Sequence, residues 1–229
     1  MAHLEIEHQG GVSIRIRADV TDVEQVSAAV DRYRVHYGPP QIVICAAAIQ
    51  GPIGPFLESS PKAFTDTINV NLMGVANVCR AVLPQMADRR SGKVIAIAGR
   101  GAMSARPNFS AYAASKAALV RFVETIAAEF SDSNVQINCM SPGGTYTAMT
   151  DEVLRAGDLA GWKEVEEAEQ VRATGGVSPD KQIQLALFLA SEQSNHITGK
   201  LIHVNDDWKK LKTSNVHQEM YTLRRVHRI

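Results

Sequence analysis

The sequence has no excess of either charge. Lys and Arg together number 24 and so do Asp and Glu, which gives a formal net charge of zero with histidine neutral. A neutral chain has no field of one sign to draw it to nucleic acid or to an anionic membrane. We therefore expect neither nucleic acid nor a membrane as a partner.

Long apolar runs and cysteines are also scarce. No stretch approaches the roughly 20 apolar residues of a membrane span, and the start MAHLEIEHQGG resembles neither a secretory signal nor a transit peptide. The three cysteines, Cys45, Cys79 and Cys139, lie among apolar residues at unrelated spacings. This placement suits buried thiols in a reducing compartment rather than disulfides or a metal site, so we expect a cytoplasmic protein without a bound metal.

Apolar runs alternate with helical stretches along the whole chain. The expected strands are VSIRIRAD, QIVICAAA, KVIAIAG, VQINCMSP and GKLIHVND, and the expected helices cover 22–37, 62–86, 112–130 and DKQIQLALFLASE. Such alternation predicts a parallel sheet with helices on both faces, in one domain over residues 1–229. QIVICAAA and KVIAIAG are nearly continuous apolar runs, which predicts strands buried on both faces.

Two loops rich in Gly and Pro, QGPIGPF and SPGGTYTAMT, follow expected strand ends. Open α/β sheets bind ligands at the carboxyl ends of their strands, so these loops are the expected location of a binding site. Residues 148–180 are expected to form a lid over it. Within the lid, Met149, Leu154 and Trp162 either contact a partly apolar substrate or pack the lid onto the body.

A tyrosine and a lysine four residues apart, Tyr112 and Lys116, begin one of the expected helices. Residues at this spacing lie on one face of a helix, and a neighbouring ammonium lowers the pKa of a phenol toward neutrality. The pair is therefore a candidate for general acid and base chemistry. Taken alone, the same spacing is more often found on a solvated helix face.

The segments RADVTD, VNLMG, SAYAASK, SPGGTYT and ITGKLIHV follow one another between residues 17 and 204. In this order and spacing the chain resembles the short-chain dehydrogenase/reductase family. The resemblance implies a Rossmann-like, doubly wound parallel sheet and hydride transfer between NAD or NADP and a small carbonyl or alcohol substrate. It also implies a homodimer or homotetramer of the complete protein.

The resemblance assigns roles to individual residues. Tyr112 would be the general acid and base, and Lys116 would orient the nicotinamide ribose and lower the pKa of the tyrosine. Asn71 would hold a water in the proton relay, or else it merely ties two backbone segments together. The residues implied to contact the cofactor, besides Tyr112 and Lys116, are Asp19 at the adenine, Ala46 and Ala47 through their backbone, Pro142, Gly143 and Thr145 at the nicotinamide, and Thr147.

One departure from the family pattern concerns the hydroxyl that should hold the substrate's oxygen. The family's serine falls on Gly99, or on Ala98 in a related branch, and neither residue has a side-chain donor. Losing one such donor typically costs about 10²–10³ in rate. Ser104, Arg100 or backbone N–H groups of this loop are candidates to replace it.

Two further departures lie toward the start of the chain. CAAA stands where the family has Asn-Asn-Ala-Gly, so the amide side chains that tie this strand to its neighbours are missing. No glycine-rich turn after a strand precedes Asp19. By resemblance, HLEIEHQGG is the end of the second helix and VSIRIRAD the third strand, so we expect an amino-terminally truncated domain that lacks its first two strands and its phosphate loop. VSIRIRAD would then either pair directly with QIVICAAA or remain unpaired.

Two functions follow from these observations. The first is an oxidoreductase of this family, with activity expected only in the full-length parent. The alternative is a non-catalytic binding or oligomerisation subunit, which the three departures favour. Retention of four polar residues in register, Tyr112, Lys116, Asn71 and Thr147, favours the enzyme. The sequence leaves the substrate and the choice between NAD and NADP open.

The chain as given is expected to bind NAD(H) and NADP(H) weakly. Nothing before Asp19 supplies a helix N-terminus with free N–H groups for the pyrophosphate, so the dinucleotide would be held only at its two ends. Calorimetric titration of the 229-residue chain should therefore give a dissociation constant weaker than micromolar. A micromolar constant would contradict this prediction.

Overall fold

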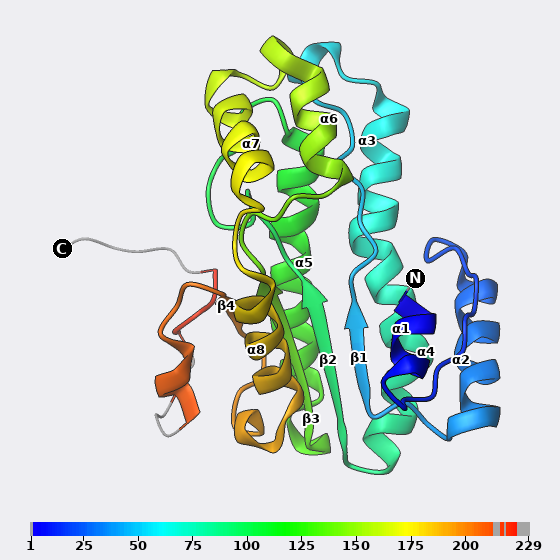
Figure 1. Cartoon of the computed structure of the whole chain (residues 1–229). Helices are drawn as coiled ribbons and strands as arrows, with labels where there is room; N and C mark the ends of the chain where they lie inside the picture. The colour runs from blue at the N-terminus through cyan, green and yellow to red at the C-terminus, as the bar shows by residue number, and fades with distance from the viewer. Residues whose placement is uncertain (1, 213–215, 218, 224–229) are drawn as a thin grey trace.

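The computed structural model of the protein describes residues 2–212, 216–217 and 219–223 (Figure 1). Its strands are β1 (Ile42–Cys45), β2 (Gly92–Ile97), β3 (Val135–Ser141) and β4 (Leu201–His203). Its α-helices are α1 (Ala2–His8), α2 (Val23–Tyr37), α3 (Pro61–Ile68), α4 (Gly74–Asp88), α5 (Ser110–Glu129), α6 (Ala148–Ala156), α7 (Trp162–Thr174) and α8 (Pro179–Ala190). A π-helical turn, η2 (Asn69–Met73), joins α3 to α4, and short 3-10 turns lie at 56–58, 131–133, 157–159, 192–194 and 208–212. The expected helices are thus confirmed.

The strands form one parallel sheet in the order β1-β2-β3-β4. Its register places Ile44 opposite Ile95, and Ala96 opposite Cys139. Each strand is followed by at least one helix before the next strand begins, as parallel crossover connections require. The α/β fold with a parallel sheet, predicted from the alternating pattern, is confirmed.

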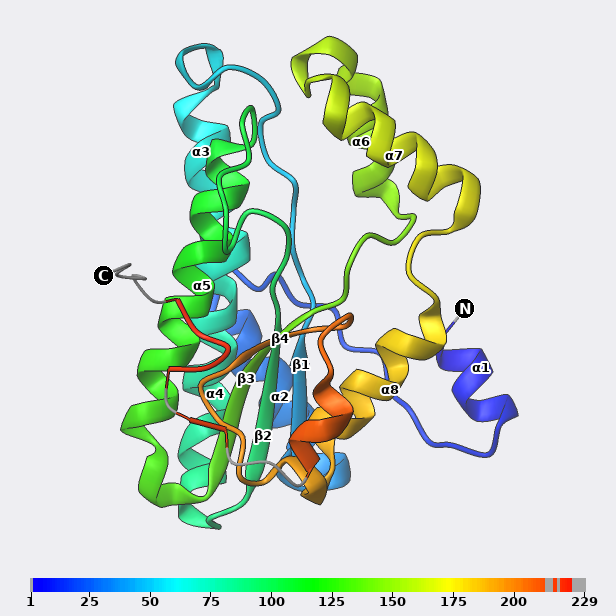
Figure 2. The ribbon, with the colours of Figure 1, turned by 90° about the vertical axis from the view of Figure 1, so that its left-hand side faces the viewer.

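Helices cover both faces of the sheet (Figure 2). On one face α4 and α5 pack against the strands, with Leu119, Val123 and Ile137 almost fully buried between them. On the other face α8 contributes Leu185 and Phe188 to a second core. None of the helices in the described part of the chain is both long and apolar enough to cross a membrane.

The segment VSIRIRAD forms no strand, which corrects the sequence prediction. A parallel strand needs a hydrogen-bonding neighbour, and within the described residues nothing pairs with the outer edge of β1. Ile42 and Ile44, which point to one face of β1, are about half exposed, at 47% and 52%, whereas Val43 and Cys45 on the other face pack against the core with α4 and α5. The prediction that QIVICAAA is buried on both faces is therefore wrong, whereas β2 is buried as predicted.

Residues 12–20 lie beside α2 and α4 rather than in the sheet. Ile14 and Ile16 line a small cavity together with Tyr33 of α2. At the end of this segment, Asn77 Nδ2 of α4 donates to the Val20 carbonyl oxygen at 3.0 Å. The segment is thus fixed to the helical layer by side-chain contacts.

Ile44 and Ile95 lie opposite each other in the sheet, so substitutions at the two positions test whether β1 is exposed to solvent. Replacing Ile95, which is 1% exposed, with alanine should lower the free energy of unfolding by about 2–5 kcal/mol. The same change at Ile44 should cost about 1 kcal/mol or less, because much of that side chain is already in water. Urea unfolding of the two variants measures the difference. Equal losses would mean that β1 is covered in solution.

Candidate active site

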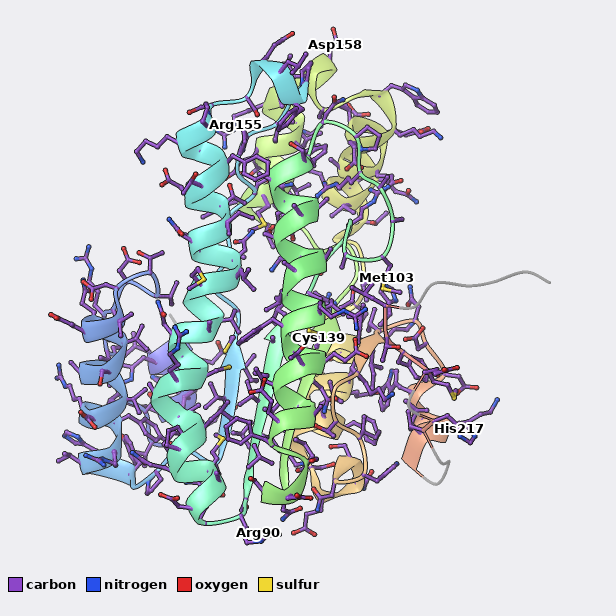
Figure 3. The ribbon with its side chains drawn as sticks, turned by 180° about the vertical axis from the view of Figure 1, so that it is seen from behind. Arg90, Met103, Cys139, Arg155, Asp158 and His217 are labelled. Carbon is purple, nitrogen blue, oxygen red and sulfur yellow. The ribbon has the colours of Figure 1, made fainter. Side chains whose placement is uncertain are left out.

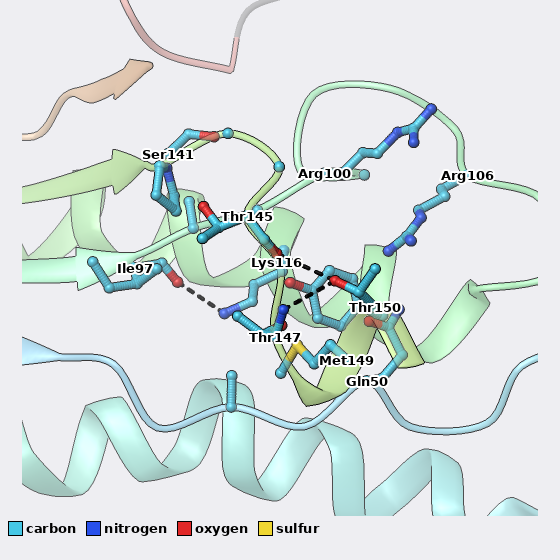
Figure 4. Close-up of a pocket in the computed structure, with 18 of the residues that line it drawn as sticks. Gln50, Ile97, Arg100, Arg106, Lys116, Ser141, Thr145, Thr147, Met149 and Thr150 are labelled. Carbon is cyan, nitrogen blue, oxygen red and sulfur yellow. Dashed lines mark hydrogen bonds between the residues drawn. The ribbon is translucent and has the colours of Figure 1, made fainter. Parts of the chain in front are cut away.

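A cavity of about 1120 Å³ lies at the carboxyl ends of the strands. Its lining comes from the loops after each strand and from the helices α5, α6 and α7 (Figure 4). Both loops that the sequence singled out contribute, QGPIGPF through Gln50 and SPGGTYTAMT through several residues. The predicted location of the site agrees with this cavity.

Tyr112 and Lys116 line the cavity from the first turns of α5. Helix α5 packs against the sheet, so both residues are buried. The exposed fraction is 8% for Tyr112 and 2% for Lys116. The Lys116 ammonium donates to the Ile97 carbonyl oxygen at 2.8 Å, at the end of β2, and lies 5.6 Å from the centroid of the Tyr112 ring. The structure therefore brings the predicted acid–base pair together.

Burial dominates the electrostatics of the pair. It raises the pKa of Tyr112, an effect that the positive charge of Arg106 opposes. It also lowers the pKa of Lys116 to about 8. Arg106 is thus a second cation beside the phenol, in addition to Lys116, whose ammonium lies 5.6 Å from the centroid of the ring. Without a ligand in the cavity, Tyr112 is a protonated phenol at neutral pH.

Asn71 lies behind the pair, in the π-helical turn between α3 and α4, and is fully buried. Its Oδ1 accepts from the Ile49 N–H at 2.9 Å, and its Nδ2 donates to the Ile49 carbonyl and to Ser115 Oγ, both at 3.0 Å. Both amide N–H groups are used, so the side chain has none left for a water. The geometry supports the second reading, in which Asn71 ties the loop after β1 to α5.

The structure shows why a hydroxyl at Gly99 is absent. A Cβ added at Gly99 would lie 2.5 Å from Tyr112 Oη, so the phenol occupies the space that a serine side chain needs. Ala98 packs into the core between the sheet and α4 and α5. Of the suggested substitutes, both of which border the cavity, Ser104 is exposed, and Arg100 is engaged by the carboxylates of Glu167 and Glu164.

The sequence analysis missed Arg106, which lies next to Tyr112. The Phe109 N–H donates to the Arg106 carbonyl at 3.2 Å, and Asn108 between them adopts a positive φ of 67°, so a turn places Arg106 beside the start of α5. Its Nη2 donates to Glu164 Oε2 of α7 at 2.8 Å. Pro107 and Asn108 were the available signal for the turn.

Gln50 was also missed, although it belongs to a loop that the sequence singled out. Only 4% of this residue is exposed, and it lines the cavity. Its Nε2 atom has no hydrogen-bond partner among the described residues. A buried amide donor without a partner is costly, which indicates that a ligand supplies the acceptor.

The lid residues Met149, Leu154 and Trp162 were expected either to contact the substrate or to pack the lid onto the body, and they differ in this respect. Met149 lines the cavity from α6, whereas Leu154 packs against the cluster that includes Phe109 and Tyr112. Trp162, at the start of α7, is 71% exposed and stacks with Lys163. Of the three, only Met149 is placed to touch a substrate.

Most of the residues expected at the nicotinamide end border the same cavity; they are Ala46, Pro142, Gly143, Thr145 and Thr147. The Thr147 side chain caps the N-terminus of α6, and Thr145 Oγ1 accepts from Gln182. Ala47 and Asp19 do not line the cavity. Asp19 lies on an exposed turn, where its Oδ1 accepts from the Thr21 N–H and hydroxyl.

The cavity fits one end of a nicotinamide dinucleotide better than the other. Small side chains at Ala46, Ala98 and Gly99 leave room beside the Lys116 ammonium for a ring and a ribose. The pyrophosphate finds no comparable site among the described residues. Helix α2 starts near Asp19, but the Asp22 carboxylate already accepts from its first N–H groups, at 2.9 and 3.0 Å.

Comparison with known proteins identifies the family. A family profile described as enoyl-(acyl carrier protein) reductase matches residues 2–206. The chain belongs to the short-chain dehydrogenase/reductase family. The oxidoreductase UcpA of Salmonella typhimurium is 33% identical over 198 residues, which cover 85% of this chain and 75% of UcpA. The 5-keto-D-gluconate 5-reductase of Escherichia coli K12 is 30% identical over 207 residues, 89% of this chain and 80% of that enzyme.

Solved structures agree with the fold of a short-chain dehydrogenase/reductase. A gluconate 5-dehydrogenase from Burkholderia cenocepacia, in complex with NADP and tartrate, superposes with a TM-score of 0.77 at 26% identity, covering 88% of this chain and 77% of the other. A single-residue variant of actinorhodin polyketide ketoreductase, with NADPH, gives a TM-score of 0.79 at 23% identity, over 88% and 79% of the two chains.

Asn71→Ala tests whether this residue acts structurally. The change leaves the Ile49 N–H and carbonyl and the Ser115 hydroxyl without their buried partner, so the free energy of unfolding should fall by at least about 2 kcal/mol. Asn77→Ala is the control, because that side chain makes one comparable bond, to Val20. Chemical denaturation should show a clearly larger loss for Asn71→Ala, and equal losses would contradict the structural role.

Proposed function

We propose that the protein transfers hydride between NAD or NADP and a small carbonyl or alcohol, with Tyr112 as the general acid and base. The single observation that carries this proposal is the enclosed Tyr112–Lys116 pair at the carboxyl ends of the strands. Membership of a family of oxidoreductases supports it. The nicotinamide, when bound, gives or takes the hydride.

The chemistry of Tyr112 follows from its protonation state. In reduction, hydride adds to the carbonyl carbon while the electron pair of the C=O π bond moves to oxygen, which takes the phenol's proton. Burial keeps that proton on Tyr112 at neutral pH. The phenolate left behind is stabilised by the nearby positive charges of Lys116 and Arg106.

The substrate we propose is a small molecule with several oxygen atoms. The cavity lining combines apolar side chains, such as Met149 and Val153, with polar groups from Gln50, Arg106 and Thr150. Two of the similar proteins are named for 5-keto-D-gluconate and for gluconate, which supports a polar substrate of this size.

Cofactor affinity and assembly complete the proposal. Because α2, the helix that begins near Asp19, has its first N–H groups occupied by the Asp22 carboxylate, we assign full activity to a full-length protein that supplies a phosphate-binding turn. We expect that protein to form a homodimer or homotetramer. The three cysteines are free thiols, in keeping with the cytoplasm.

A non-catalytic role remains the second candidate, because one observation favours it. The space for the expected hydroxyl at Gly99 is filled by Tyr112 Oη. A protein that had given up catalysis would tolerate that loss. In such a subunit Tyr112 would contribute packing alone.

Tyr112→Phe separates the two functions. With NADH or NADPH and 5-keto-D-gluconate or a 3-oxoacyl thioester as probes, loss of the proton donor should lower turnover by about 10²-fold or more. For the unaltered protein, reduction should be constant through neutral pH, whereas oxidation of the matching alcohol should rise with pH because it needs the phenolate, whose pKa is raised. Absorbance of the reduced nicotinamide reports both rates.

The contrary outcome is equally clear. If the unaltered protein and Tyr112→Phe show the same residual rate with every probe, at every pH and in a full-length protein, the non-catalytic role is correct. Thermal unfolding of both proteins controls for misfolding of the variant.

A further inference from the structure

We propose that Arg106 holds the oxygen of the substrate during reduction, and so replaces the serine hydroxyl that is missing at Gly99. This inference rests on the proposed function. It assigns a catalytic role to a residue outside the motifs that identified the family.

The position of Arg106 is fixed by three groups. Its guanidinium carbon lies 3.8 Å from the centroid of the Phe109 ring and 5.4 Å from that of Tyr112. Its Nε and Nη2 atoms donate to Glu164 Oε2 at 3.2 and 2.8 Å. Only 9% of the side chain is exposed. The cation is therefore held beside the acid–base residue.

One end of the guanidinium remains available. Among the described residues, Nη1 of Arg106 has no hydrogen-bond partner, because Glu164 engages only Nε and Nη2. The side chain lines the cavity and points into it (Figure 4). An oxygen that accepts a proton from Tyr112 must lie within about 3 Å of its hydroxyl. The Arg106 guanidinium, 5.4 Å from the centroid of the same ring, borders the cavity in which that oxygen would lie.

The other candidates for the missing donor are weaker. Arg100 is engaged by Glu167 and Glu164 and its side chain is 47% exposed, and Ser104 is exposed too. Gln50 Nε2 is buried and unpaired among the described residues, but a neutral amide stabilises a developing negative charge less than a guanidinium does. We assign Gln50 to another oxygen of the substrate and Arg106 to the carbonyl oxygen.

The role requires no change in the protonation of Arg106. As the hydride forms the new C–H bond, negative charge develops on oxygen, and Nη1 donates a hydrogen bond to it while keeping its proton. Tyr112 supplies the proton that is transferred. The arrangement also depends on the lid, because Glu164, which orients the guanidinium, belongs to α7.

The test compares four variants in the reduction of 5-keto-D-gluconate and of a 3-oxoacyl thioester. Arg106→Gln should lower kcat by about 10²–10³-fold, the usual effect of removing one donor to a developing oxyanion. Arg106→Lys should recover part of that loss. Arg100→Gln removes the same charge from the same loop, and because Arg100 is held by Glu167 and Glu164 it should lower kcat much less than Arg106→Gln does. Glu164→Gln breaks the ion pair but leaves Arg106 in place as the hydrogen-bond donor, so it should lower kcat less than Arg106→Gln does.

Added guanidinium ion gives a further readout. It should restore part of the turnover of Arg106→Ala, because the cavity left by the side chain can take the free ion. A kcat for Arg106→Gln equal to that of the unaltered protein would overturn the inference, and so would a loss in Glu164→Gln as large as that in Arg106→Gln. A large loss confined to Gln50→Ala would overturn it too and give the role to Gln50.

A titration independent of turnover covers the case in which neither probe is reduced. The Tyr112 phenolate, followed by ultraviolet absorbance with Tyr112→Phe subtracted, should form at higher pH in Arg106→Gln and at unchanged pH in Arg100→Gln. No shift would overturn the inference. If Tyr112→Phe also leaves turnover unchanged, the proposed function fails as well, whereas failure of the Arg106 variants alone leaves that function intact.

Discussion

The site depends on the packing of α5 against the sheet. Figure 3 shows α5 lengthwise, lying along the sheet. Its residues Leu119, Val123 and Ala127 are at most 1% exposed, and they fix the rotation of the helix about its axis. Tyr112 and Lys116, one helical turn apart, are thereby directed to the carboxyl end of β2. The bond from the Lys116 ammonium to the Ile97 carbonyl exists only because strand and helix meet at this place. A rotation of α5 would separate all three groups.

That packing also explains how charged groups are retained in a buried site. Lys116 is buried and its pKa is lowered to about 8, so its charge is costly and poorly compensated by protein groups. The Arg106 guanidinium, in contrast, forms an ion pair with Glu164 of the lid at 2.8 Å. Two cations beside one phenol would otherwise repel each other. A lid carboxylate that neutralises one of them allows the site to stay assembled, which couples the position of α7 to the acid–base chemistry.

The sequence predicted those features that depend on local periodicity. The helices, the parallel sheet and the proximity of Tyr112 to Lys116 follow from spacings of a few residues. Such local spacings do not depend on how the elements pack against one another. Arg106 could not be predicted, because its partner Glu164 lies 58 residues away and its place depends on a left-handed residue at Asn108. VSIRIRAD has the composition of a strand, yet it does not pair with β1, whose outer edge has no partner among the described residues. Composition gives a segment a tendency to form a strand, but the strand forms only when a neighbouring strand pairs with it.

The two halves of the proposed cofactor site therefore depend on different parts of the fold. The nicotinamide half lies on β2, β3 and α5, whose cores are complete within the described residues. The phosphate half would lie beyond β1, where Ile42 and Ile44 are half exposed and α2 begins with an occupied N-terminus. Acid–base geometry can therefore be correct while dinucleotide affinity is low.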